Sequence, residues 1–253
     1  MTSGFKEKAV VVKQEKIASD VYSMWIQTEE IAKNAKAGQF ITVFSKDGSR
    51  LLPRPISICE IDGSMLRIVY RVVGKGTSEF STFKSDEVID IQGPLGNGYT
   101  LFDKKAILLG GGIGIPPMLE LAKQLNCEKE IILGYRDELF LDEEFAQYGK
   151  VTIATEDGSV GTKGNVLDAM KEHSITGDVI YACGPKPMLR AIKVYAQENN
   201  IEAYISMEEK MACGVGACLG CVCQSTEIDD HSRVYNKRVC KEGPVFNSKE
   251  VEI

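Results

Sequence analysis

Several features that mark whole classes of proteins are missing from this sequence. Positive charge is not in excess, because the net charge is −6, and this argues against an electrostatic nucleic-acid footprint. No uninterrupted apolar run is long enough to span a bilayer, and residues 1–14 have no apolar signal-peptide core. We therefore expect no membrane and no nucleic-acid partner. We expect a cytoplasmic location, where thiols stay reduced.

Histidine is scarce, and there are no internal repeats and no low-complexity tracts. The two histidines, His173 and His231, lie in polar segments, and we expect both at the surface. What the sequence does have is ample apolar material. Hydrophobic residues make up 43% of 253 positions, enough to bury a core in one large domain or two ordinary ones.

The hydrophobic pattern divides the chain into three parts. Residues 1–102 hold six short runs of β-branched residues between Gly, Asp and Pro turns, which is typical of a small antiparallel barrel. Residues 103–207 alternate apolar strands with helical stretches, which indicates a parallel α/β sheet with crossovers. Residues 208–253 show little periodicity and hold five of the eight cysteines, so something other than a hydrophobic core must fix them.

Four cysteines fall within eleven residues, in the stretch MACGVGACLGCVC. Cys213, Cys218 and Cys221 have the C-x4-C-x2-C spacing of plant-type [2Fe–2S] ligands, which needs a fourth cysteine from further along. We favour Cys240, because it follows a polar excursion that can fold back as a loop. Cys223, two residues after Cys221, is the alternative. Structural zinc and a set of free buried thiols are the other possibilities. Zinc sites usually pair two C-x2–4-C knuckles, and the second is missing here.

Two glycine turns are typical of a dinucleotide site. In GGGIGIPP, Gly112, Gly114 and Pro117 depart from the dinucleotide fingerprint, because proline replaces the third glycine. The two glycines still let the backbone approach a pyrophosphate at a helix N-terminus, where proline is tolerated. In CGPKPML, Cys183 and Gly184 lie at a later strand end, where open α/β sheets bind ligands. The alternatives are a tight turn without a ligand and an inert core cysteine.

The residues after the second strand of this part bear on nucleotide preference. Asp137 and Glu138 offer carboxylates that can hold a ribose 2′-OH, which favours NADH over NADPH. Arg136 beside them weakens that preference. The sequence therefore leaves both nucleotides open, with NADH favoured.

The barrel part holds a candidate phosphate clamp. In RPIS, Arg54 lies in a Pro-flanked turn and can bind phosphate, and Ser57 can hydrogen-bond a ring nitrogen. Gly76 and Thr77, in GKGT, offer backbone and hydroxyl donors near a chain reversal. A surface arginine and an ordinary turn are the alternatives.

These motifs together resemble a known superfamily. RPIS, GKGT, GGGIGIPP and CGPKPML, in this order, are similar to those of the ferredoxin–NADP reductase superfamily, which joins an FAD-binding β-barrel to an NAD(P)-binding α/β domain. With the cysteine stretch and RVCKEGPVF, the whole chain resembles the family of electron-transfer subunits of NAD-dependent dihydroorotate dehydrogenases. The resemblance implies cluster ligation by Cys213, Cys218, Cys221 and Cys240. It implies FAD contacts at Arg54, Pro55, Ile56, Ser57, Val69, Tyr70, Arg71, Gly76 and Thr77.

The resemblance also implies an activity. NADH, FAD and a [2Fe–2S] cluster form a set in which the flavin joins hydride transfer to single-electron transfer. The nicotinamide would lie near Ser57 and Cys183, our two candidate catalytic residues, and no general base is needed. The implied partner is an FMN-containing dihydroorotate dehydrogenase subunit, two of each chain, whose electrons pass through the cluster and FAD to NAD⁺. The rival hypotheses are a stand-alone reductase serving a ferredoxin or an oxygenase, and a non-enzymatic, zinc-stabilised binding module.

Overall fold

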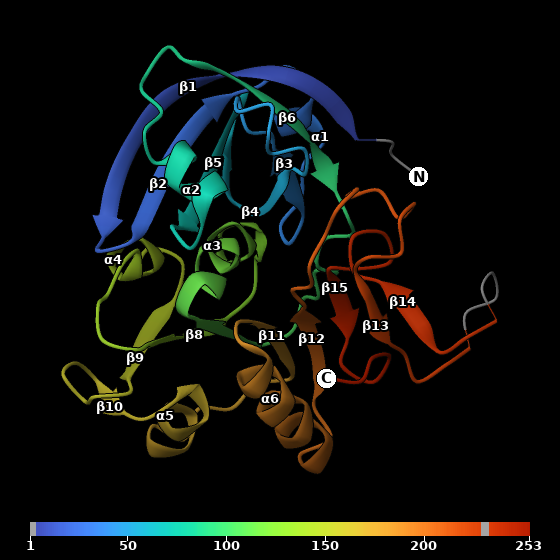
Figure 1. Ribbon diagram of the computed structural model, residues 1–253. Helices are drawn as coiled ribbons and strands as arrows, with labels where there is room; N and C mark the ends of the chain where they lie inside the picture. The colour runs from blue at the N-terminus through green and yellow to red at the C-terminus, as the bar shows by residue number, and fades with distance from the viewer. Residues whose placement is uncertain (1–3, 229–232) are drawn as a thin grey trace.

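The computed structural model describes residues 4–228 and 233–253, so His231 lies outside the described residues. Its first part is a closed barrel of six antiparallel strands in the order β1-β2-β5-β4-β3-β6 (Figure 1). The strands are β1 (Phe5–Ala18), β2 (Val21–Gln27), β3 (Phe40–Val43), β4 (Arg54–Asp62), β5 (Met65–Arg71) and β6 (Val88–Leu95). Two short helices, α1 (Ile31–Asn34) and α2 (Lys75–Phe80), lie in the connections.

Side-chain alternation gives the barrel an inner and an outer face. Ile41 and Val43 on β3 point into the barrel core, together with Ile58, Leu66 and Ile68. Phe40, the neighbour of Ile41, instead packs outside the barrel in a second cluster. The outer face of β3 and β4 is thus turned toward the rest of the chain.

The second part is a seven-stranded sheet in the order β10-β9-β8-β7-β11-β12-β15. Its first six strands pair in parallel. They are β7 (Ala106–Gly111), β8 (Lys129–Tyr135), β9 (Lys150–Thr155), β10 (Thr162–Lys163), β11 (Val179–Cys183) and β12 (Glu202–Ser206). The connections hold the 3₁₀ turn η1 (Gly112–Gly114) and the helices α3 (Pro116–Gln124), α4 (Asp142–Phe145), α5 (Val166–Glu172) and α6 (Lys186–Glu198). His173, which follows α5, is exposed, as expected.

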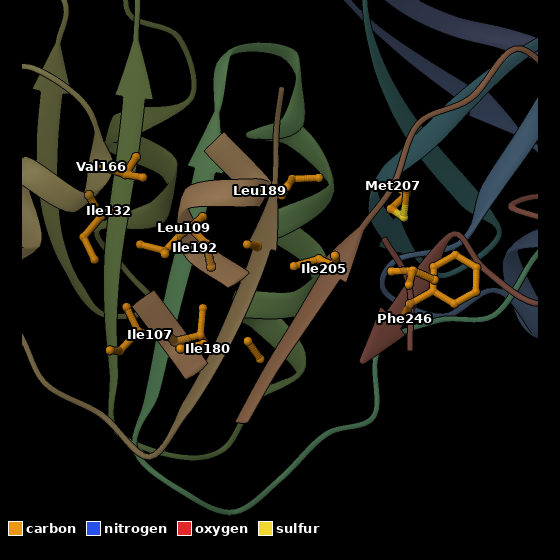
Figure 2. Packing of buried hydrophobic residues seen from close by; sticks show 14 of the residues in the cluster. Ile107, Leu109, Ile132, Val166, Ile180, Leu189, Ile192, Ile205, Met207 and Phe246 are labelled. Atoms are coloured by element: carbon orange, nitrogen blue, oxygen red, sulfur yellow. The ribbon is translucent and has the colours of Figure 1, made fainter. Parts of the chain in front are cut away.

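Both faces of this sheet are buried, as expected for parallel strands. Leu108 and Ile131 point toward α3 and α4, which lie between the sheet and the barrel. Ile107, Leu109 and Ile132 point to the opposite face and pack against α5 and α6 (Figure 2). The core on this second face continues past Ile205 to Met207 and Phe246 of the C-terminal segment, so the cysteine-rich tail is packed onto the sheet.

The tail itself has little regular structure. β13 (Val222–Gln224) and β14 (Asn236–Arg238) form a two-stranded ribbon, and β15 (Val245–Asn247) adds to the edge of the large sheet, antiparallel to β12. The tail also contacts the barrel, since Asn97 N–H donates to Gly243 O at 2.7 Å. The predicted architecture, an antiparallel barrel, a parallel α/β sheet and a small C-terminal segment, is confirmed. The strand β15, by which the tail joins the sheet, was not predicted.

Within residues 4–228 and 233–253, no helix has the length and apolar character needed to cross a membrane.

A buried arginine joins the barrel to the sheet part. Arg67 on β5 is only 5% exposed. Its Nε donates to Ser23 Oγ at 2.8 Å, and its Nη2 donates to Glu144 Oε1 on α4 at 3.0 Å. The guanidinium therefore holds α4 against the barrel wall through charge-assisted hydrogen bonds.

Replacing this arginine should destabilise the fold. We expect Arg67→Met to lower the free energy of unfolding by about 2 kcal/mol, because Ser23 and Glu144 lose their charged donor. Urea denaturation measures this. The matched control is Lys13→Met, which removes the exposed Lys13–Glu15 pair and should change stability by less than about 1 kcal/mol. Equal losses in the two variants would contradict the role given to Arg67.

Candidate functional site

The predicted phosphate clamp lies at the start of β4. The Arg54 side chain packs on Gly76, where an added Cβ would lie 2.7 Å from Arg54 Nε. Arg54 also donates a hydrogen bond to Leu52 O. Among the described residues, no carboxylate forms an ion pair with Arg54, so its charge is free to bind an anionic ligand. The fold brings Arg54 and Gly76 together although they are 22 residues apart in sequence.

Ser57 lies on the outer face of the barrel. It pairs directly with Phe40, whose side chain points outward, so the two side chains share that face. Pro55 pairs with Thr42 and shares the face too. Ile56 alternates with them and packs against the barrel core, so its backbone rather than its side chain lines the outside.

The other predicted barrel contacts divide between the two faces. Val69 points outward, toward the sheet part. The Tyr70 ring lies inside the barrel, where its hydroxyl donates to Gln14 Oε1 at 2.8 Å and burial raises its pKa. Its backbone, but not its ring, lines the outside. The Thr77 hydroxyl is also engaged, accepting from the N–H of Val73 at 3.0 Å, so it shapes its own loop.

A cavity of about 280 Å³ lies between the barrel and the sheet. Arg71 from the end of β5, Gly112 and Asp137 all line it, so it joins predicted flavin and nucleotide residues. Glu138 lines it as well, but its Oε2 accepts the N–H of Ser19 on the β1–β2 turn at 2.9 Å, which lowers the pKa of Glu138. Asp137 Oδ1 likewise accepts the N–H of Glu138 at 2.8 Å, so a backbone N–H engages each of the two carboxylates. The remaining lining residues are Ala18, Ser19, Asp20, Tyr135, Arg136 and Phe140.

The two glycines of the first turn have different roles. Gly112 has φ +52° and open space where a Cβ would point, so its backbone is exposed to the cavity. Gly114 faces the second glycine turn, where an added Cβ would lie 2.4 Å from Cys183 O. Only glycine allows this close approach of two strand ends. Pro117 is buried in the first turn of α3, as predicted.

Cys183 and Gly184 lie at the carboxyl end of β11, beside the end of β7. Burial raises the pKa of the Cys183 thiol to about 12, so the thiol is neutral at physiological pH. A neutral thiol can orient a ligand but is a poor nucleophile. Tyr99, which the sequence did not single out, supports this strand end through a hydrogen bond from its hydroxyl to Ala182 O at 3.2 Å.

The cysteine loop is built around sulfur acceptors. Cys213 Sγ lies 3.3 Å from the backbone nitrogen of Ala217 and 3.4 Å from that of Cys218. Burial acts to raise the pKa of Cys213, but the N–H groups of Val215 and Cys218 outweigh it and lower the pKa to about 6. Such donors stabilise a thiolate, the form that binds iron.

The other three predicted ligands also accept backbone N–H groups. Cys218 Sγ accepts from Gly220, and Cys221 Sγ accepts from Cys240, both at 3.4 Å. Cys240 Sγ accepts from Gly216 at 3.1 Å. Burial, followed by the neighbouring Cys221, raises the pKa of Cys240 to about 12.

Glycine is required in this loop. Gly214 and Gly216 have φ of +70° and +82°, which turns the backbone N–H groups inward. An added Cβ at Gly216 would also lie 2.9 Å from Lys241 Cβ. Four sulfurs surrounded by N–H donors fit an iron–sulfur cluster, because hydrogen bonds to the sulfurs are a regular feature of such sites.

Cys223 has different surroundings. It lies in β13, paired with Lys237, and is buried in the apolar cluster beneath the loop. Burial raises its pKa to about 11. Over residues 4–228 and 233–253, no three His, Cys, Asp or Glu side chains are grouped so as to hold a single metal ion.

One part of the chain outside these motifs also stands out. Six large apolar side chains of the cysteine loop and of the adjoining β13–β14 ribbon are at least 40% exposed, and we call them the loop patch: Val215, Leu219, Val222, Ile228, Val234 and Tyr235. No sequence pattern singled out this surface. Its only signal was apolar residues placed among cysteines and polar residues, where burial could not be judged.

Comparisons with known proteins agree with this site. Residues 208–252 match the family model of the iron-sulfur cluster binding domain of dihydroorotate dehydrogenase B. The chain is 42% identical over 249 residues to the dihydroorotate dehydrogenase B (NAD(+)) electron transfer subunit of Caldanaerobacter subterraneus subsp. tengcongensis, covering 98% of each. It is 42% identical over 263 residues to the subunit of the same name from Fusobacterium nucleatum, again covering 98% of each.

A solved structure is similar over nearly the whole chain. It is that of an NADH-dependent reduced ferredoxin-NADP oxidoreductase, which is 30% identical with a TM-score of 0.86 and covers 97% of this chain and 90% of its own. Phthalate dioxygenase reductase, 17% identical with a TM-score of 0.63, shares the fold and covers 93% of this chain and 94% of its own. The identity and coverage of the curated relatives decide the family. The chain belongs to the family of dihydroorotate dehydrogenase B (NAD(+)) electron transfer subunits.

Proposed function

We propose that this chain passes electrons from a separate dihydroorotate-oxidising subunit to NAD⁺ in pyrimidine biosynthesis, in the cytoplasm. The observation that carries the proposal is that the clamp at Arg54, the glycine turns and the cysteine loop all belong to one packed body. We divide this body into an FAD-binding barrel (1–102), an NAD-binding part (103–207) and a cluster-binding part (208–253).

The cofactors of the proposal are FAD, a [2Fe–2S] cluster and NAD(H). When bound, the flavin exchanges hydride with nicotinamide and single electrons with the cluster, which no side chain can do. Cys213, Cys218, Cys221 and Cys240 hold the cluster. The residues that hold FAD are Arg54, Pro55, Ile56, Ser57, Val69, Tyr70, Arg71, Gly76 and Thr77, with Ile56 and Tyr70 acting through their backbones.

The nucleotide binds at the carboxyl ends of β7, β8 and β11. Gly112 and Gly114 bring the backbone close to the pyrophosphate, and Pro117 starts the helix behind them. Asp137 binds a ribose hydroxyl, which favours NAD over NADP. Ser57 and Cys183 orient the reacting rings, and Gly184 follows Cys183 and packs against Gly111 and Met188. The neutral Cys183 thiol moves no proton, and hydride transfer then depends on position alone.

The loop patch is the proposed docking surface for the partner. The partner is an FMN-containing catalytic subunit, and the assembly has two copies of each chain. Leu219 is 56% exposed one residue after Cys218, which is itself exposed, so a protein covering the patch would approach the cluster directly. Exposed apolar surface beyond what is normal for a monomer marks interaction sites.

A charged residue in the loop patch should uncouple the two subunits. We expect Leu219→Glu to weaken binding to the catalytic subunit at least about 100-fold, as for a central interface residue. The variant should keep NADH-driven dye reduction, which does not need the partner. Val194→Glu is the matched control, since Val194 is 51% exposed on α6, away from the patch. Calorimetric titration with the catalytic subunit measures both variants. Unchanged affinity for Leu219→Glu would overturn the docking surface.

A second candidate function is reduction of a ferredoxin-type acceptor. It is favoured by the 30% identical structure, whose name is that of a reduced ferredoxin-NADP oxidoreductase. A dihydroorotate dehydrogenase gene next to the gene for this chain would support the first function. NADH-driven ferredoxin reduction without any response to the catalytic subunit would support the second.

A further inference from the structure

Two of the most exposed apolar side chains of the described residues lie beside the phosphate clamp. Leu51 is 84% exposed and Val73 is 80% exposed, and Leu52, next to Leu51, is 54% exposed. Leu51 and Leu52 precede β4, while Val73 follows β5 and precedes α2. None of the three belongs to the loop patch.

Contacts bring the two segments that carry these side chains together. Arg50 Nη1 donates to Lys75 O at 3.1 Å. Arg54 donates to Leu52 O, and its guanidinium packs on Gly76. The two segments that carry the exposed apolar side chains therefore lie on either side of a guanidinium that has no carboxylate partner among the described residues.

This combination describes a ligand of particular chemistry. A cation without an ion-pair partner favours binding of an anionic group. The exposed aliphatic side chains favour a ligand in which a flat apolar group is attached to that anion. A nucleotide has both, a phosphate joined to an aromatic base. Apolar contacts of this kind supply most of the surface buried by a cofactor, while a few polar groups orient it.

We propose that Leu51, Leu52 and Val73 form an apolar clamp on the adenine of FAD and so set the preference for FAD over FMN. This inference rests on the proposed function, since it assumes that the clamp at Arg54 binds FAD. FMN has the flavin and one phosphate but no adenine. The clamp therefore contributes to FAD binding and contributes nothing to FMN binding.

The test compares the two flavins on the full chain. The variants are Leu52→Ala combined with Val73→Ala, and Leu51→Ala alone. Dilution of the purified holoprotein, followed by flavin fluorescence, gives the FAD dissociation constant. Exchange with excess FMN gives the relative FMN affinity. We expect the FAD dissociation constant of the double variant to rise about tenfold, with FMN affinity unchanged, because truncation removes contact with the adenine.

Controls distinguish a failure of the adenine clamp from a failure of the proposed function. Leu101→Ala, at a site 45% exposed elsewhere on the surface, should leave both affinities unchanged. Wild-type protein without any bound FAD would overturn the proposed function itself. Wild-type protein that binds FAD, with variants that bind it equally well, would overturn the adenine clamp alone. Equal loss of FAD and FMN, or loss of partner binding with intact FAD affinity, would also overturn it, because the side chains would then contact the flavin ring or a protein.

Discussion

Cys240→Ser is expected to abolish the iron–sulfur cluster, and Cys223→Ser is expected to retain it. Cys240 makes two hydrogen bonds to the cysteine loop. Its sulfur accepts from Gly216 N–H at 3.1 Å, and its own N–H donates to Cys221 Sγ at 3.4 Å. These two contacts place Cys240 beside Cys221 and against the backbone of the cysteine loop at Gly216. Cys223 is held in the β13–β14 ribbon and contributes to the apolar core.

Iron and sulfide content, with the electron paramagnetic resonance spectrum of the reduced protein, measure the result. A serine hydroxyl is a poor ligand for iron compared with a thiolate, so the loss should be complete or nearly so. Cys59→Ser serves as a further control, because Cys59 is fully buried in the barrel wall and far in sequence from the loop. A cluster that survives in Cys240→Ser and disappears in Cys223→Ser would reverse the assignment of the fourth ligand.

Arg54→Met is expected to weaken FAD binding by about 10- to 100-fold. A charge-assisted hydrogen bond to phosphate contributes about 1.5–3 kcal/mol, and the variant loses it while keeping the aliphatic stem that packs on Gly76. The FAD affinity of Arg54→Lys should lie between those of the wild-type protein and Arg54→Met, because lysine keeps the charge but loses the planar fork.

Flavin fluorescence on dilution of the holoprotein measures this effect. Arg190→Met is the matched control, since Arg190 lies on α6 and donates to Ile253 O, away from the barrel. It should leave FAD binding unchanged. Equal FAD affinity in Arg54→Met and wild-type protein would remove Arg54 from the proposed site.

The sequence was most informative where one physical pattern dominated. The six barrel strands followed from β-branched runs between turns, and the sheet followed from alternating strands and helices. The spacing of Cys213, Cys218 and Cys221 predicted a cluster loop, and the structure surrounds these sulfurs with N–H donors. The choice of Cys240 depended on a long loop folding back, which spacing alone does not decide.

Other features depend on packing that no local pattern records. β5 is almost wholly buried, so apolar residues occupy both of its faces, and the inward position of Tyr70 could not be read from alternation. β15 is only three residues long, and its pairing with β12 depends on how the tail packs. The contact of Arg67 with Glu144 joins residues 77 apart in sequence, so only the tertiary fold reveals it.

The most direct test of the proposed function follows the electrons themselves. The purified holoprotein is mixed anaerobically with the FMN-containing dihydroorotate dehydrogenase subunit from the same source, and NADH formation is followed after dihydroorotate is added. We predict NADH formation that requires both chains and is lost in Cys240→Ser. No NADH formation, despite intact FAD, an intact cluster and active NADH-driven dye reduction, would contradict the proposal and leave a reductase for another acceptor.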